Sequence, residues 1–153
     1  MTWAPHVTVA TVVQRDGRFL MVEEMTGDGL RFNQPAGHLE QGESLLHAAV
    51  RETLEETAHH VTPDALVGIY RWTHPSGITY LRFAFSARVT GFDPDRPLDE
   101  GILRAVWLTP DEVRGCAARH RSPLVLACME DYLAERRMPV DALRDYAGAE
   151  TPR

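Results

Sequence analysis

Three glutamates near the end of the stretch GHLEQGESLLHAAVRETLEET have the spacing most suited to chemistry. Glu55 and Glu56 stand three and four residues after Glu52, so in a helix the three carboxylates share one face. Like charges at this spacing weaken a helix by about 0.2–0.5 kcal/mol per pair. A divalent cation turns the repulsion into attraction, and Mg²⁺ and Mn²⁺ prefer carboxylate oxygens as ligands. The spacing therefore predicts a divalent-metal site on a helix.

Histidines raise the alternative of a transition-metal site. The candidates are His38, His59, His60 and His74. Their spacings match no zinc site, and the neighbouring carboxylates suit Mg²⁺ or Mn²⁺ better. His59 shares the face of the glutamates, so a supporting role beside the metal stays open for it.

A change of sequence period at residue 44 predicts the helix that carries the glutamates, over residues 44–57. Ser44 is a suitable N-cap. One stripe at i, i+3, i+4 spacing is formed by Leu46, Ala49, Val50, Thr53, Leu54 and Thr57. The glutamates fall on the opposite side together with Ala48. The pattern thus predicts a helix that packs one face on a core and points its acids away.

Alternating and β-branched residues predict most of the other elements as strands. These strands cover residues 6–14, 19–24, 67–74, 79–89 and 102–108, with a short extended piece at 31–37. Capping signals start two more helices, at Thr109 and at Ser122, the second running to about residue 136. The tail from Met138 is polar and is expected to be loosely held. This order predicts an α/β fold, a mixed sheet with helices packed on it, in one domain over residues 1–153.

The net charge of the chain limits the kinds of molecule that it is expected to bind. Net charge is −6 with a pI of about 5.6, and no Lys/Arg cluster appears, which argues against polymeric nucleic acid. A small phosphorylated metabolite remains possible, because bound metal can neutralise both protein and ligand. No apolar run is long enough to span a membrane, and no secretory signal is visible. With Cys116 and Cys128 interpreted as buried thiols, the expected location is the cytoplasm.

Six residues in and before the predicted helix follow the pattern Gly-x5-Glu-x7-Arg-Glu-x2-Glu-Glu. They are Gly37, Glu43, Arg51, Glu52, Glu55 and Glu56. The pattern resembles the signature of the Nudix hydrolases, with the Nudix box at residues 37–59. Outside the box, PHVTVATVV, NQPAGHLE, the Trp72…Pro75…LRFAF block and RSPLV resemble the NudJ-type phosphatases, which hydrolyse thiamine pyrophosphate and its pyrimidine precursor. The resemblance spans residues 5–125 and implies a Nudix-type α/β/α sandwich with a loop-helix-loop catalytic motif.

The resemblance also implies roles for the residues of the box. Glu52, Glu55 and Glu56 would hold Mg²⁺, with Mn²⁺ possible, together with the backbone carbonyl of Gly37. A glycine at that position lets the loop approach the ions closely. Arg51, which the helical pattern puts off the acidic face, would pair with Glu43 in a structural role.

A general base must take a proton from the water that attacks phosphorus. Members of the family use different residues for this step. Glu55 is our first candidate. Glu100, in the loop DPDRPLDEG, is the alternative base or an additional metal ligand.

Four residues outside the box are candidates for binding substrate. Trp72 and His74, at the end of a strand, could stack on a pyrimidine ring, although a tryptophan is more often a core residue. Arg82 and Arg31 could bind phosphate, against the alternative of ordinary salt bridges.

The sequence departs from the family pattern just after the last glutamate. The family usually has glycine where this chain has Ala58. A left-handed conformation costs alanine about 1 kcal/mol, which favours a helix that continues towards Val61. Every metal-ligand position is retained, so the departure does not indicate an inactive enzyme.

The resemblance implies Mg²⁺-dependent hydrolysis of a phosphoanhydride in a small nucleotide-like pyrophosphate. Thiamine pyrophosphate or hydroxymethylpyrimidine pyrophosphate is the preferred substrate, with nucleoside di- and triphosphates secondary. Two alternatives stay open: a nucleotide-pool pyrophosphatase acting on (d)NTPs, and a non-catalytic metabolite sensor with the same fold. Either a monomer or a homodimer fits.

Overall fold

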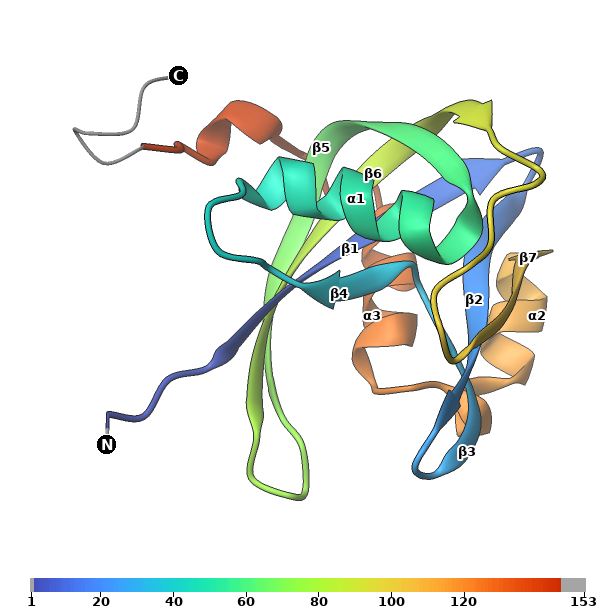
Figure 1. Cartoon of the computed structure of the whole chain (residues 1–153), viewed down its shortest axis with the longest axis horizontal. Helices are drawn as coiled ribbons and strands as arrows, with labels where there is room; N and C mark the ends of the chain where they lie inside the picture. Colours follow the sequence, from blue (N-terminus) through green and yellow to red (C-terminus); the bar gives the residue numbers. More distant parts are fainter. Residues whose placement is uncertain (1, 147–153) are drawn as a thin grey trace.

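A mixed eight-stranded sheet forms the middle layer of the computed structural model, which describes residues 2–146 (Figure 1). The strand order is β3-β2-β1-β6-β5-β8, with β4 paired to β1 and β7 paired to β2. β1 and β6 run parallel and the other pairs antiparallel. The strands are β1 His6–Arg15, β2 Arg18–Thr26, β3 Gly29–Asn33, β4 Ala36–His38, β5 His59–Thr73, β6 Thr79–Phe92, β7 Ile102–Leu108 and β8 Met138–Pro139.

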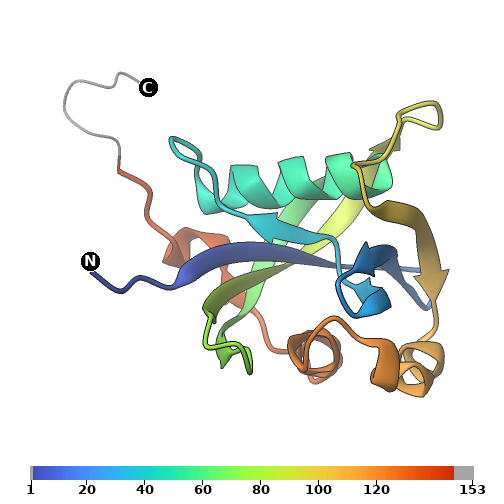
Figure 2. The ribbon, with the colours of Figure 1, turned by 60° about the horizontal axis from the view of Figure 1, so that its bottom comes forward.

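Helices cover both faces of this sheet, as Figure 2 shows. Helix α1 (Leu45–Thr57) lies on one face, and α2 (Pro110–Gly115) and α3 (Leu124–Leu133) lie on the other. Two short 3₁₀ turns, η1 (Ala117–Arg119) and η2 (Val140–Ala142), complete the described chain. The predicted α/β/α sandwich is confirmed. Within the described residues, every helix is too short or too polar to cross a bilayer.

Alternation along β1 builds the two halves of the core. Val9 packs towards α1 with Ala48 and Ala49, whereas Val12 packs towards α3 with Met129. All of these side chains are at most 1% exposed. Burial of each larger apolar side chain contributes about 1.5–3 kcal/mol, so both helical layers are held firmly on the sheet.

The end of α1 differs from the prediction of a helix continuing towards Val61. The helix stops at Thr57, and Ala58 adopts the left-handed conformation with φ of 59°. The Ala58 N–H donates to the Leu54 carbonyl, and the Ala58 carbonyl accepts from the Asp93 N–H, both at 2.9 Å. Pairing of β5 with β6 then begins at once, with His59 opposite Phe92. These hydrogen bonds offset the conformational cost, so a glycine is not required.

Other element boundaries also differ from the predicted ones, because strand pairing between distant parts of the chain determines them. β5 begins at His59 rather than 67 and passes Pro63 with irregular register on the way. α3 ends at Leu133 rather than near 136. The start of the tail is not loose, since β8 pairs with β5 (Ala65 opposite Pro139). Residues 147–153 of the predicted tail lie outside the described residues.

Candidate metal and substrate site

Two side-chain hydrogen bonds fix the start and the orientation of helix α1, which carries the acidic residues. The Ser44 side chain caps its first turn by accepting from the His47 N–H at 3.1 Å. In the middle of the helix, the fully buried hydroxyls of Thr53 and of Thr11 on β1 are 2.8 Å apart. This bond fixes the rotation of the helix about its axis. The neighbouring Glu52 is thereby aimed at the loop before the helix.

The acidic face does not point away from the core as predicted. Glu56 is only 8% exposed, and Ala48 is fully buried. Glu56 accepts a hydrogen bond from the Ala36 N–H at 2.9 Å. The prediction was wrong because α1 packs against β4 as well as against the central strands, so it buries a wider arc. Burial raises the pKa of Glu56 to about 9 and also raises the pKa of Glu52.

Gly37 lies against the carboxylate of Glu52. A Cβ at position 37 would overlap the carboxyl carbon and both oxygens of Glu52. Only glycine permits this approach of β4 to α1. The loop was predicted to come close to metal ions at Gly37; in the structure, the group that it meets there is the Glu52 carboxylate. This close approach brings the loop backbone and the Glu52 carboxylate together, as the proposed metal site requires.

Arg51 links the loop to the helix. Its Nε and Nη2 atoms donate to the two carboxylate oxygens of Glu43 at 3.0 and 2.7 Å, the pair that the resemblance implied. Arg51 does not lie off the acidic face, however. Its Nη1 also donates to Glu52 at 2.7 Å and to Glu55 at 2.9 Å. One guanidinium thus offsets the mutual repulsion of the carboxylates within the motif.

A cluster of carboxylates near the C-terminal half of α1 could hold a cation. Among the described residues, Glu52, Glu55 and Asp99 each place one oxygen within 4.8 Å of the others. The Asp99 N–H donates to the Glu55 carbonyl at 3.0 Å, which ties the loop to the helix. Glu100 is the next residue but is not a member of this cluster. The all-oxygen donor set fits Mg²⁺ or Mn²⁺.

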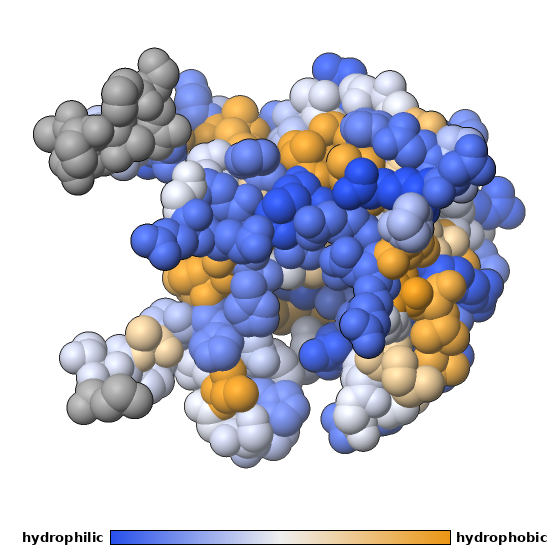
Figure 3. Space-filling view, in the orientation of Figure 1, coloured by the Kyte–Doolittle hydropathy of each residue, from blue (hydrophilic) through white to orange (hydrophobic). Residues whose placement is uncertain are grey.

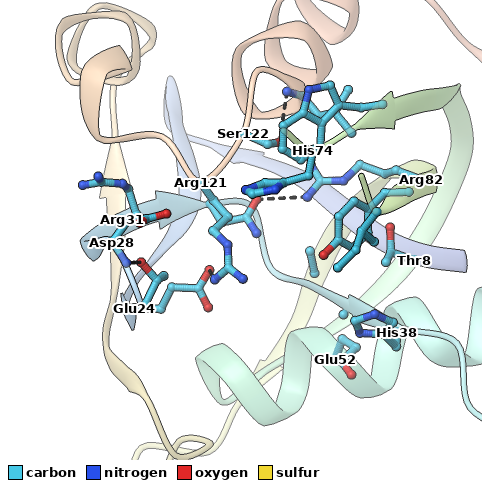
Figure 4. A pocket seen from close by; sticks show the side chains of 18 of the residues that line it. Thr8, Glu24, Asp28, Arg31, His38, Glu52, His74, Arg82, Arg121 and Ser122 are labelled. Carbon is cyan, nitrogen blue, oxygen red and sulfur yellow. Dashed lines mark hydrogen bonds and ion pairs between the residues drawn. The ribbon is translucent and has the colours of Figure 1, made fainter. Parts of the chain in front are cut away.

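A cavity of about 550 Å³ opens beside this cluster. In Figure 3 it appears as a hollow below the hydrophilic band of α1, between the tips of the β2–β3 and β5–β6 hairpins. Glu52, Glu56 and Gly37 line it, whereas Glu55 and Glu100 do not. All four predicted substrate residues line it as well: Arg31, Trp72, His74 and Arg82 (Figure 4).

Aromatic rings form one wall of the cavity. Trp72 stacks on Tyr80 across the β5–β6 hairpin, with ring centroids 5.9 Å apart and planes 19° apart. The rings of His74 and Trp72 are nearly perpendicular, with centroids 5.5 Å apart. Tyr80 was not among the predicted residues, although strand pairing places it opposite Trp72. The wall offers a flat surface to a planar ring.

Three arginines also line the cavity. Arg82 is 6% exposed, and its guanidinium donates to Asn33 at 3.1 Å and to Gln34 at 3.0 Å. Arg121 also lines the cavity and donates to Glu24 at 3.1 Å. Arg121 was missed, although it begins the RSPLV segment. Counting Arg31, the cavity lining presents three guanidinium groups to an anionic ligand.

His59 does not support the acidic site. It is 7% exposed, and its Nδ1 lies 2.7 Å from the Thr57 carbonyl. Its ring packs against Phe92 and Trp107. The open alternative of a role beside the metal is therefore wrong: His59 is a core residue on the first position of β5.

Comparison with known proteins agrees with this geometry. The model of the NUDIX domain matches residues 3–128. The chain belongs to the NUDIX family. It is 38% identical over 142 residues to "Phosphatase NudJ" of Escherichia coli K12, covering 93% of this chain and 92% of that protein. A solved NUDIX hydrolase from Nitrosomonas europaea is 54% identical, with a TM-score of 0.91 over 94% of this chain and 98% of that one.

A more distant structure shows how far the fold extends. A MutT NUDIX hydrolase from Burkholderia pseudomallei is 17% identical, with a TM-score of 0.72 over 84% of this chain and 98% of that one. Together with the family match, these relatives identify a Nudix hydrolase that acts on pyrophosphates. Its substrates are small phosphorylated molecules, and the carboxylate cluster fits the divalent metal that such enzymes use.

The first prediction separates Asp99 from Glu100 as a metal ligand. We expect Asp99→Asn to raise the Mg²⁺ concentration for half-maximal activity about tenfold or more, since even groups that only support ligands cost about 10–100-fold in affinity. Glu100→Gln should raise it less than about twofold. Steady-state hydrolysis over a Mg²⁺ titration measures both, with Asp95→Asn as the control from the same loop. A larger effect for Glu100→Gln would show that Asp99 is not the ligand.

The second prediction concerns pH and the metal-free protein. The pKa of Glu56 in the folded state is raised from 4.5 to about 9. The native state therefore binds the extra proton between these values, and the free energy of unfolding falls as pH rises through this window, by at most about 1.4 kcal/mol per pH unit. Glu56→Gln keeps an acceptor for the Ala36 N–H and should remove this part of the pH dependence. Denaturant unfolding in chelator from pH 5 to 9 measures it; identical slopes in both proteins would contradict the assignment.

Proposed function

We propose that the protein hydrolyses a phosphoanhydride of a small nucleotide-like pyrophosphate in a Mg²⁺-dependent reaction, with Mn²⁺ as a substitute. Thiamine pyrophosphate or hydroxymethylpyrimidine pyrophosphate is the preferred substrate, and nucleoside di- and triphosphates are secondary. One observation carries the proposal: a single cavity joins carboxylates of the proposed metal site, a buried arginine and an aromatic stack. These groups match the metal-bound pyrophosphate and the planar ring of such a substrate.

The carboxylate end of the cavity is where the reaction would take place. Glu52, Glu55 and Glu56, with the Gly37 carbonyl, are the proposed ligands, and Asp99 joins them from the loop. When bound, Mg²⁺ would neutralise charge on the pyrophosphate and lower the pKa of a water.

We propose Glu55 as the general base. Its carboxylate is 30% exposed and is held by Arg51 at 2.9 Å. Glu55 is therefore accessible to water and oriented at the same time, as the transfer of a proton from the attacking water requires. Glu100 is the alternative base, since it adjoins Asp99 on the same loop.

The arginine end would bind phosphate. The buried charge of Arg82 has amide acceptors and no carboxylate partner among the described residues. A buried cation without a counter-ion is costly, and a phosphate oxygen in the cavity would supply the missing charge. Arg31 donates to the Leu30 carbonyl and has no ion pair within residues 2–146, so it is available to bind a phosphate as well.

The aromatic wall would bind the organic part of the substrate. Trp72 and Tyr80 stack on each other and line the cavity together with His74. Stacking of a base on an aromatic side chain contributes about 1–3 kcal/mol and tolerates different bases. This surface suits a pyrimidine ring and also accounts for nucleotides as secondary substrates. The curated relative of this chain is named a phosphatase, which favours release of orthophosphate.

The thiols fit the proposed location. Cys116 and Cys128 are both free, and Cys128 is buried. Free thiols are typical of a reducing compartment, so we place the enzyme in the cytoplasm. There it would act as a monomer or homodimer on a dissolved metabolite, with neither a polymeric nucleic acid nor a membrane as its partner.

The third prediction tests substrate and product together. Purified enzyme is incubated with thiamine pyrophosphate, the four dNTPs, ADP-ribose and a dinucleoside polyphosphate, in Mg²⁺ and in chelator. We expect orthophosphate to be released fastest from thiamine pyrophosphate, and only with metal. Pyrophosphate released fastest from a dNTP would instead identify a nucleotide-pool pyrophosphatase. Tight binding without turnover of any compound would identify a sensor.

A further inference from the structure

Two neutral amides surround the guanidinium of Arg82. Nη2 donates to Oδ1 of Asn33 at 3.1 Å, and Nη1 donates to Oε1 of Gln34 at 3.0 Å. All three side chains are at least nine-tenths buried: Arg82 is 6% exposed, Asn33 8% and Gln34 2%. Figure 4 shows the guanidinium at the cavity wall. Asn33 and Arg82 line the cavity, and Gln34 lies behind them.

The orientation of Gln34 is fixed from both ends. Its Nε2 donates to the Val125 carbonyl in the first turn of α3 at 2.7 Å, while its Oε1 faces Arg82. The reverse orientation would set the amide oxygen against a carbonyl and the NH₂ against a guanidinium. Gln34 thus holds Arg82 at a fixed place relative to α3 without contributing charge.

Acids around this region have other partners. Asp131 accepts a hydrogen bond from the hydroxyl of Tyr70, the residue opposite Arg82, at 2.6 Å. Glu23 binds Arg104 and Arg119, and Glu24 binds Arg121. In the described part of the chain, no carboxylate pairs with Arg82. The Cys128 thiol lies 3.9 Å away, and burial raises its pKa, which keeps it neutral. Both terminal nitrogens of Arg82 therefore have neutral acceptors, while its positive charge is not neutralised by an ion pair within the described residues.

We infer that Asn33 and Gln34 are positioning residues that keep the buried charge of Arg82 available for an anionic group of the substrate. The amides orient the guanidinium by accepting hydrogen bonds from Nη1 and Nη2, and the phosphate that enters the cavity supplies the counter-charge. This inference rests on the proposed function, in which Arg82 binds a phosphate of the substrate. It adds a reason why amides rather than carboxylates stand beside the arginine.

Replacing Asn33 with aspartate would neutralise the charge of Arg82 within the protein while nearly preserving the shape of the side chain. It would keep the acceptor for Nη2 and add a negative charge next to the guanidinium. The folded protein would gain an ion pair at a buried cation, whereas the substrate would lose its counter-charge. Stability and substrate affinity should therefore change in opposite directions, which loss of structure alone would not produce.

The test compares Asn33→Asp with Asn33→Ala, using both thiamine pyrophosphate and dGTP as substrates with Mg²⁺. We expect Asn33→Asp to raise KM about tenfold or more with kcat within about threefold, and to melt at or above the wild-type temperature. Asn33→Ala, which adds no charge, should raise KM less. Gln14→Glu, at the far end of β1, adds the same charge away from the cavity and should leave KM unchanged.

Further outcomes distinguish this inference from the proposed function. If Arg82→Gln leaves KM unchanged, the role of Arg82 in the proposed function is wrong, and the inference is wrong with it. If Arg82→Gln raises KM and Asn33→Asp does not, only the inference is overturned. It is also overturned if Asn33→Ala raises KM as much as Asn33→Asp. An Asn33→Asp protein that melts below the wild type, or fails to fold, contradicts the expected ion pair and overturns it as well.

Discussion

The close contact between helix α1 and strand β4 is the constraint on which the site depends. The Glu52 carboxylate occupies the space that a side chain at Gly37 would need. The Thr11–Thr53 bond fixes the rotation of the helix, and the Ala36 N–H binds Glu56 beneath β4. The helix therefore cannot move away from the loop without losing buried hydrogen bonds, each contributing about 0.5–1.5 kcal/mol. This rigidity keeps acidic oxygens at one end of the cavity.

The two ends of the cavity carry opposite excess charges, and these charges suit a metal ion together with a phosphorylated substrate. At the α1 end, several carboxylates share one guanidinium, that of Arg51, so negative charge is in excess. At the α3 end, the partners of Arg82 among the described residues are two amides and a thiol, none of them a carboxylate, so positive charge is in excess. A metal ion with a phosphorylated substrate compensates both ends at once, with the ion against the acids and phosphate oxygens against the arginine.

Sequence patterns predicted the parts of this structure that depend on local spacing. The helix of the Nudix box, the pair of Arg51 with Glu43, and most strands follow from periodicity, capping and the motif. The burial of Glu56 did not, because helical period does not report that β4 covers a second side of α1. Asp99, a member of the carboxylate cluster, was not predicted, because an aperiodic loop gives no sign of which side chain faces the helix. The amides beside Arg82 lie 48 and 49 residues away in sequence, and only the folded sheet brings them together.

The most direct measurement is a crystal structure with Mn²⁺ and a non-hydrolysable thiamine pyrophosphate analogue, with the ion located by anomalous scattering. The expected result is Mn²⁺ bound by Glu52 and at least one of Glu55, Glu56 and Asp99, with an analogue oxygen within hydrogen-bonding distance of Arg82 and its ring on Trp72. An ion bound away from α1, or an analogue whose phosphates do not reach Arg82, would contradict the account.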